Sequence, residues 1–402
     1  MTLLATPDAV ARCRTDAPLP WLGGLRPSEF LRDYWQKKPL LVRNAFPALA
    51  DLLEPRELLE LAETEDVESR LIIEQGKTPY ELREGPFHAT TWRKLPATGW
   101  TALVQAVDHY LPPLADLLDH FAFVPEWRID DVMVSYAVPG GNVGPHYDLY
   151  DVFLVQGPGQ RRWQLGERCD ENTPRSPHSQ LKILSDMPVH FDETLSCGDF
   201  LYVPPHLAHH GVAVSECLTY SVGFRAPALT HLLEHLVDAS LQEAEAATLF
   251  TDASRALPAA PLALTADDGI ALHRQAMALL LSPERLLPAL APLLSEPKYG
   301  DYEPEGETVS RGDLRSFLAE GGDLLRDPAS RWLWLEQSGT LWVNGQVMDL
   351  PASGSARQLT AMLQGRRLHN HALSQLDDAG LDWLCQLLGS GLLLAVDGLS
   401  PA

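Results

Sequence analysis

The sequence of 402 residues lacks any apolar run long enough to cross a bilayer, because a membrane-spanning helix needs about 20 consecutive apolar residues. Its first residues lack the basic start and apolar stretch of a secretion signal. The five cysteines are scattered, with neither the spacing of a zinc site nor that of a disulfide framework. These absences predict a cytoplasmic protein with reduced thiols and no membrane partner.

Basic side chains are also few. The 31 Lys and Arg residues stand against 54 Asp and Glu, which gives a formal net charge of −23. That balance disfavours direct binding to nucleic acid, whose phosphates require cations, and favours a basic protein partner. Solubility alone also explains an acidic composition. At this length we expect two or three domains.

The most informative stretch runs from Gly140 to Phe224. Its first motif reads Gly140-Gly-Asn-Val-Gly-Pro-His146-Tyr-Asp148. Residues two apart share one face of a β-strand, so a strand here would present the imidazole of His146 and the carboxylate of Asp148 together. A histidine from a neighbouring strand would complete the 2-His-1-carboxylate set, which leaves positions open on iron(II) for a cosubstrate and dioxygen.

A second motif selects that third histidine. It reads Gly198-Asp-Phe-Leu-Tyr-Val-Pro204-Pro-His206-Leu-Ala-His209-His210-Gly211, and the spacing of the two motifs resembles the signatures of cupin and jelly-roll metal sites. Counting from the glycine through the proline of that pattern places the ligand at His209. His206 stands where cupins usually have glycine, and His210 is expected to point to the opposite face of the strand.

Short apolar segments separated by turn residues favour an antiparallel β fold. We expect a hairpin from 151–156 and 161–165, joined by the turn Gly157-Pro-Gly-Gln160. Helices are expected over 54–63 and 100–123, with Pro112-Pro113 breaking the second. Further strands are expected at 69–74, 131–138, 182–184, 200–203 and 218–224. Together these elements predict a jelly roll or cupin barrel within a mixed α+β fold.

After Pro227 the expected elements change from short strands to helices. Apolar residues recur at helical spacing in 229–250, 266–281 and 283–294. These helices are too apolar to stand alone in water. Burial against a second subunit and burial in a bundle within the same chain are both open.

A third region begins near Lys298. Its helices and a late hairpin at 332–347 resemble a winged-helix module, but the exposed positions form no basic stripe of the kind that binds DNA. We therefore divide the chain into a jelly-roll domain with N-terminal helices over 1–227, a helical region over 228–297, which is the dimerisation region if a second subunit covers it, and a winged-helix-like domain over 298–402.

The strand after the first motif carries a cation. Arg161 shares a face with Trp163 and Leu165, so its side chain is expected inside the barrel, whereas Arg162 and Gln164 face outward. A guanidinium buried there is costly unless it meets an anion, and the distal carboxylate of a 2-oxo acid is the natural partner. Pairing with a neighbouring Asp or Glu is the alternative.

Two serines are candidates for a hydroxyl donor. Ser135, on the strand before the first motif, shares a face with Met133 and is placed to donate to substrate or oxo acid. Ser221 is a second such residue. For both, a serine that is simply satisfied within the core is the alternative.

Longer segments carry a family resemblance. Trp127-Arg-Ile-Asp-Asp-Val-Met-Val-Ser-Tyr136, the stretch from Asn142 to Gln156, and Tyr220-Ser-Val-Gly-Phe-Arg-Ala-Pro227 resemble the JmjC-type ribosomal oxygenases. Within that family they look most like the bacterial arginine hydroxylases of a large-subunit ribosomal protein, number sixteen. The resemblance covers residues 19–227 with specific motifs and extends more loosely over the two regions that follow.

This resemblance implies a JmjC-type double-stranded β-helix that binds iron(II) through His146, Asp148 and His209. It implies 2-oxoglutarate as a cosubstrate held partly by Arg161, dioxygen as the other cosubstrate, and succinate and carbon dioxide as coproducts. It also implies hydroxylation of an arginine β-carbon in a basic ribosomal protein, and a homodimer. Related histidine hydroxylases often have lysine where Arg161 stands, so arginine there favours the arginine branch.

Acidic residues near the first motif, Asp130, Asp131 and Asp151, would suit a guanidinium substrate unless they are paired within the fold. His206 departs from the family pattern and bears on the shape of the entrance to the site.

Two other functional classes stay open. A demethylase of the same family would share the triad, as would a histidine hydroxylase. A non-catalytic cupin that binds a ribosomal or regulatory partner is expected to have lost a triad residue, and here all three are present.

Overall fold

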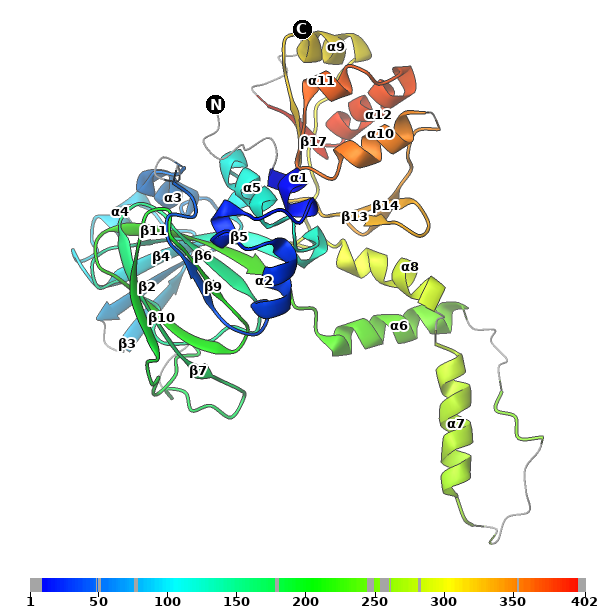
Figure 1. Cartoon of the computed structure of the whole chain (residues 1–402), viewed down its shortest axis with the longest axis horizontal. Helices are drawn as coiled ribbons and strands as arrows, with labels where there is room; N and C mark the ends of the chain where they lie inside the picture. The colour runs from blue at the N-terminus through cyan, green and yellow to red at the C-terminus, as the bar shows by residue number, and fades with distance from the viewer. Residues whose placement is uncertain are drawn as a thin grey trace. The chain divides into compact units, whose positions relative to one another are not determined.

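The computed structural model describes residues 9–47, 49, 52–75, 79–177, 181–243, 249–253, 260, 262–280, 283–352 and 354–396. The chain divides into two compact units, each built from separate stretches of sequence (Figure 1). Unit 1 contains residues 1–226, 301–330 and 351–402, and unit 2 contains residues 227–300 and 331–350. The predicted domain boundaries after residues 227 and 297 stay a prediction.

The first segment of unit 1 holds five α-helices and eleven strands among its described residues. The helices are α1 (Ala9–Arg14), α2 (Pro27–Asp33), α3 (Pro55–Leu61), α4 (Ala89–Trp92) and α5 (Pro112–Leu118). The strands are β1 (Leu40–Val42), β2 (Ser69–Gln75), β3 (Pro79–Glu84), β4 (Trp100–Val104), β5 (Ile129–Ala137), β6 (Val152–Gln156), β7 (Gln160–Arg168), β8 (Phe191–Ser196), β9 (Phe200–Val203), β10 (Leu207–Ala213) and β11 (Cys217–Phe224).

Two antiparallel sheets form the centre of this segment. The larger has eight strands in the order β1-β9-β6-β11-β5-β4-β2-β3, and the smaller has three in the order β10-β7-β8. Apolar side chains of both sheets pack together as one cluster: Val152, Leu154, Trp163, Leu165, Leu195, Leu201, Val203 and Leu207. The jelly roll predicted from the sequence is therefore confirmed, and this cluster is its interior.

A second core covers the other face of the eight-stranded sheet. Along β6, Val152 and Leu154 belong to the interior, whereas Phe153 belongs to the outer core, because successive side chains of a strand point to opposite faces. Phe30 of α2 packs on Phe153 with ring centroids 5.7 Å apart. Both faces of β6 are buried, which explains its continuous apolar sequence.

The predicted hairpin of 151–156 and 161–165 is wrong. Strand β6 pairs with β9 and β11 in the larger sheet, whereas β7 pairs with β8 and β10 in the smaller one. The turn residues are real, but they carry the chain from one sheet to the other. Gly159 has φ +83°, and a Cβ there would lie 1.9 Å from the carbonyl oxygen of Glu216, so the turn is pressed against the start of β11.

Two other local predictions fail in part. The predicted helix over 100–123 begins instead with strand β4, which pairs with β2 and β5, and its helical part is limited to α5 and short 3-10 turns. The predicted strand at 182–184 is reduced to a single bridge between Leu184 and Arg175. In both places pairing with distant strands, which local periodicity does not encode, decides the structure.

The later segments of unit 1 form a smaller α/β part. Its described elements are α9 (Arg311–Ala319), β12 (Leu324–Arg326), α10 (Ser355–Met362), β16 (Arg367–Leu368), α11 (Asn370–Leu373), α12 (Asp378–Gly389) and β17 (Leu393–Ala395). The three strands pair in the order β16-β12-β17.

Ion pairs tie these later segments to the barrel segment. Arg326, which is 4% exposed, donates from Nη2 to both carboxylate oxygens of Glu126, at 2.9 and 2.8 Å. Arg366 Nη2 lies 3.0 Å from Glu126 as well, and Arg367 Nη2 lies 3.2 Å from Asp116. We call these five residues the ion network. Its partly buried pairs are charge-assisted hydrogen bonds, which are shorter and stronger than neutral ones.

Unit 2 combines helices with a small sheet. Its described elements are α6 (Leu229–Glu243), α7 (Ala266–Ala278), α8 (Pro283–Leu294), β13 (Trp332–Leu335), β14 (Thr340–Val343) and β15 (Gln346–Met348). Its three strands are antiparallel, which confirms the late hairpin. Of the predicted helix over 229–250, the structure describes α6 as far as Glu243, and residues 244–248 lie outside the described residues.

Helix α6 contacts α8, and His235 Nε2 lies 2.8 Å from the carbonyl oxygen of Ala289. Four apolar residues of α6 recur at every fourth position, which places them on one face. They are strongly exposed: Leu229 81%, Leu233 53%, Val237 38% and Leu241 62%. Along α7, Ile270 is 64% and Met277 48% exposed, and none of the helix's residues is buried.

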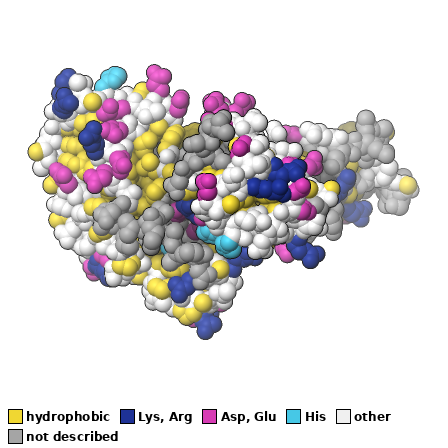
Figure 2. All heavy atoms as spheres, turned by 90° about the horizontal axis from the view of Figure 1, so that it is seen from above, with side chains coloured by type: hydrophobic (Ala, Val, Ile, Leu, Met, Phe, Trp, Pro, Cys, Tyr) yellow, Lys and Arg dark blue, Asp and Glu magenta, His cyan; other side chains and the backbone are white. Residues whose placement is uncertain are grey.

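None of the described helices is both long and apolar enough to span a membrane. On the face drawn in Figure 2, Lys and Arg side chains lie scattered among Asp and Glu.

Candidate metal centre

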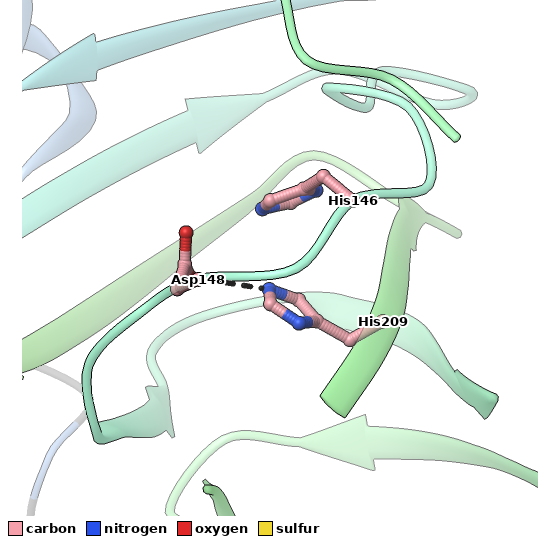
Figure 3. A group of neighbouring side chains, drawn as sticks. All are labelled: His146, Asp148 and His209. Carbon is pink, nitrogen blue, oxygen red and sulfur yellow. Dashed lines mark ion pairs between the residues drawn. The ribbon is translucent and has the colours of Figure 1, made fainter. Parts of the chain in front are cut away.

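Three predicted ligands meet at the mouth of the barrel interior. His146 and Asp148 lie in the segment that joins β5 to β6, and His209 lies on β10 (Figure 3). One ligand atom from each lies within 4.8 Å of the others, and this is the only such group of His, Cys, Asp and Glu among the described residues. The imidazole rings are 4.2 Å apart, and His209 Nε2 lies 3.5 Å from Asp148 Oδ2.

The sequence led us to expect a regular strand at the first motif, but the structure has no regular strand there. A single antiparallel bridge joins His146 to His209: each backbone N–H donates to the other's carbonyl oxygen, at 3.0 and 2.8 Å. Asn142, which is buried, shapes the loop before it by accepting a bond from the N–H of Gly144 at 2.9 Å. That Asx turn was missed in the sequence, although an asparagine among glycines signals it.

The hydrogen bonds of His146 and His209 use Nδ1 and leave Nε2 of each ring able to bind a metal. Nδ1 of His146 lies 2.9 Å from the carbonyl oxygen of Gly144, and Nδ1 of His209 lies 3.0 Å from that of Leu207. A carbonyl oxygen only accepts, so each Nδ1 carries the proton and each Nε2 keeps its lone pair. Burial, reinforced by the nearby His146, lowers the pKa of His209 to about 4, which keeps its ring neutral.

The two competing histidines have other roles. His210 points away from the triad, as predicted, and its Nε2 lies 3.2 Å from Asn142 Oδ1. His206 occupies a left-handed conformation, φ +66°, that favours glycine, and its ring stacks on Tyr147 at 5.9 Å. Its N–H donates to the carbonyl oxygen of Asp148 at 2.7 Å, so the backbone of this residue supports the ligand loop.

Arg161 lies inside the barrel and is 4% exposed. Its register partners are Ala213 on β10 and Leu195 on β8. Its Nε and Nη2 have no hydrogen-bond partner among the described residues. Arg162, one position along, faces outward and pairs with Asp192. The alternative that Arg161 is neutralised by an acidic neighbour therefore finds no support within the described part of the chain.

Ser135 and Ser221 are buried on adjacent strands of the larger sheet, 2% and 6% exposed. Ser135 is the register partner of Thr219, and Ser221 that of Met133 and Leu154. Leu154 belongs to the interior cluster, so its neighbours on that face line the barrel interior too. The two serines are thus brought to the same side of the sheet.

Two of the three acidic residues near the motif are used by the fold. Asp131 is buried and accepts a bond from the N–H of Ala106 at 2.8 Å. Asp151 is fully buried and accepts from the hydroxyl of Tyr202 at 2.6 Å and from Gln36 at 3.0 Å. Asp131 and Asp151 are therefore paired within the fold, which was the alternative to binding a substrate guanidinium.

Comparison with known proteins places this geometry in a family. Residues 116–232 match the JmjC domain and residues 273–394 match the ROXA-like winged helix. A probable ribosomal oxygenase of Haemophilus influenzae is 36% identical over 340 residues, which are 81% of this chain and 82% of that protein. The ribosomal protein uL16 3-hydroxylase of Escherichia coli is 34% identical over 325 residues, 80% of this chain and 85% of that protein.

The fold is shared as well. The structure of YcfD, a ribosomal oxygenase of Escherichia coli, in complex with cobalt and 2-oxoglutarate has 32% sequence identity and a TM-score of 0.77, and covers 92% of this chain and 98% of that one. The jelly roll and its triad thus define an oxygenase with a JmjC domain. Within that class, the chain belongs to the ribosomal oxygenases.

Proposed function

We propose that this protein is an iron(II)- and 2-oxoglutarate-dependent hydroxylase that modifies an arginine of a large-subunit ribosomal protein in the cytoplasm. The observation that carries the proposal is the presence, in one barrel, of a metal-type triad and of a buried arginine whose Nε and Nη2 have no hydrogen-bond partner among the described residues. When bound, iron(II) and 2-oxoglutarate together activate dioxygen, which supplies one oxygen atom to a substrate C–H bond as 2-oxoglutarate becomes succinate and carbon dioxide.

The three ligands are His146, Asp148 and His209. Two neutral imidazoles with free Nε2 atoms and one carboxylate form the facial donor set that iron(II) takes in oxygenases. The carbonyl oxygens that fix both Nδ1 atoms hold the rings in one orientation, as outer partners do in metal sites. These residues therefore fit the ion without a change of tautomer.

Arg161 is proposed to hold the distal carboxylate of 2-oxoglutarate. A buried guanidinium without an anion is unfavourable, and its planar fork matches a carboxylate. Ser135 is proposed to donate its hydroxyl to the same cosubstrate from the facing sheet. The apolar interior cluster excludes water around both, which strengthens the charge pairing.

The substrate assignment rests on the Escherichia coli relative, whose name states that it hydroxylates ribosomal protein uL16. A basic protein of that kind suits a chain of formal charge −23. We propose that the target is the β-carbon of an arginine, the branch that Arg161 favours over the histidine hydroxylases. Direct contact with nucleic acid is not part of the proposal.

The protein is further proposed to act as a homodimer, with the predicted region 228–297 as the dimerisation region. The exposed apolar face of α6, together with Ile270 and Met277 of α7, is the surface that a second copy would cover.

Intact mass of purified large-subunit ribosomal proteins, measured after incubation with this protein, iron(II), 2-oxoglutarate and air, tests the proposal. We expect one protein to gain one oxygen atom, with the site mapped to an arginine by fragmentation. The gain should vanish when Asp148 is replaced by Ala. Loss of a methyl group would indicate a demethylase, oxygen on a histidine would indicate the other hydroxylase branch, and no metal binding at all would return the non-catalytic cupin.

A further inference from the structure

A second buried donor lies beside Arg161. Trp163 is the next inward-facing residue of β7 and is 5% exposed. Its indole Nε1 has no hydrogen-bond partner among the described residues. Arg161 Cζ lies 5.9 Å from the centre of the Trp163 ring, and the ring of His209 lies 6.1 Å from it. Along β7, Trp163 stands between Arg161 and Leu165, and Leu165 is the register partner of His209.

Gly211 on β10 makes room for that indole. It is the register partner of Trp163, flanked by the pairs His209 with Leu165 and Ala213 with Arg161. A Cβ at Gly211 would lie 2.7 to 2.8 Å from three carbon atoms of the six-membered ring of Trp163. The indole thus lies flat across β10 in the space that a larger residue would fill.

Two neighbouring donors without acceptors are costly inside an apolar cluster, since an unsatisfied buried polar group loses its hydrogen bonds to water. One carboxylate that accepts hydrogen bonds from both Arg161 and Trp163 would remove the cost of both unsatisfied donors. Its two oxygens offer about four acceptor positions, enough for the guanidinium fork and one indole N–H. A neutral hydroxyl or a water would satisfy the indole but leave the charge of Arg161 unbalanced.

We propose that Trp163 is a cosubstrate-binding residue, whose indole N–H donates to the carboxylate of 2-oxoglutarate held by Arg161, and that Gly211 is a positioning residue that acts through the indole. This rests on the proposed function, because the carboxylate is that of the cosubstrate.

The test is calorimetric titration of the cobalt(II)-loaded protein, which does not turn over, with 2-oxoglutarate and separately with succinate. Trp163→Phe keeps the aromatic ring and removes the N–H. We expect it to raise the Kd of both acids roughly ten- to a hundredfold, the usual cost of losing a hydrogen bond to a charged group. The affinity for cobalt alone should stay within about twofold of that of the unaltered protein.

Trp342→Phe is the matched control. Trp342, on β14 of unit 2, also has a buried Nε1 without a partner among the described residues, so the same atoms are deleted in the unit that does not contain the triad. It should bind both acids as the unaltered protein does. If Trp163→Phe also binds them unchanged while Arg161→Met loses them, the inference is overturned and the proposed function stands. If Arg161→Met retains full affinity, the proposed function fails at its cosubstrate site.

Two further outcomes test the details. A loss confined to 2-oxoglutarate, with succinate unaffected, would place the indole against the 2-oxo end and overturn the shared carboxylate. Gly211→Ala should weaken both acids, and Gly211→Ala combined with Trp163→Phe should bind no more weakly than Trp163→Phe alone. Additive losses in that double variant would overturn the positioning role of Gly211, because a merely structural defect adds to the loss of the N–H.

Discussion

The barrel interior and the surface of α6 and α7 are incomplete in opposite ways. Between the two sheets, polar atoms of Arg161 and Trp163 are closed off from water and have no partner among the described residues. On the helices, apolar side chains such as Leu233 and Ile270 stand uncovered in water. The proposed cosubstrate anion would remove the first defect, and the proposed second copy of the chain would cover the second.

The largest effect is expected at the triad, where two adjacent histidines allow a matched pair. His209→Ala removes a proposed ligand, so bound iron after desalting and 2-oxoglutarate turnover should both fall, turnover by about a thousandfold or more. His210→Ala removes a histidine of the same strand that contacts Asn142 instead. It should keep the metal; equal loss of iron from both variants would contradict the ligand assignment.

Arg161→Met distinguishes the effect of the buried charge on stability from its proposed role in binding 2-oxoglutarate. Without cosubstrate, the variant should unfold at the same or a higher temperature, because an uncompensated buried cation is replaced by an apolar side chain. With cosubstrate, the Kd of 2-oxoglutarate should rise roughly a hundredfold. Thermal unfolding and calorimetry on the same samples measure both. A lower unfolding temperature in the absence of ligand would mean that Arg161 has a structural partner.

Leu233→Glu tests the helices. A carboxylate placed on the exposed apolar face of α6 should raise the dimer Kd by roughly tenfold or more, since it would be desolvated in the interface. Sedimentation over a range of concentrations measures this. Gln242→Glu adds the same charge at an exposed position of α6 that lies outside the arc of this apolar face, and it should have little effect. A dimer that survives Leu233→Glu would show that this face is not the interface.

The smallest effect is expected at the ion network. Here, unlike at Arg161, the buried arginines have carboxylate partners. Glu126→Gln removes the charge of the carboxylate that Arg326 and Arg366 share and should lower the free energy of unfolding by about 2 kcal/mol, a value discounted for the partial exposure of Glu126. Urea unfolding measures it. The exposed pair Arg56 and Glu60 supplies the control, because Glu60→Gln should change stability by less than about 0.5 kcal/mol.

Much of the site could be predicted from the sequence because it depends on short spacings. The glycine-to-histidine counts in the two motifs selected His146, Asp148 and His209, and strand alternation placed Arg161 inside and Arg162 outside. These inferences need only the two-residue period of a strand and the spacing of a motif. They do not depend on how the strands pair.

What could not be predicted depends on pairing between distant residues. The turn at 157–160 has the composition of a hairpin turn, yet the strands on either side belong to different sheets. The local sequence of β4 predicts a helix, but pairing with β2 and β5 makes this segment a strand. Asp131 and Asp151 resemble substrate-binding carboxylates, and only the positions of Ala106 and Tyr202 reveal that they are already bonded. No local pattern contains these partners.

The ion network also imposes a sequence of events during synthesis. Its partners are separated by 200 to 251 residues along the chain, so at common elongation rates Glu126 and Asp116 leave the ribosome about 10 to 50 s before the arginines that neutralise them. Once residue 209 has also been made, the nascent chain contains all three triad residues but still lacks the arginines that pair with these carboxylates. A chain terminated after residue 227 would stay permanently in that early state, because Arg326, Arg366 and Arg367 would never be made.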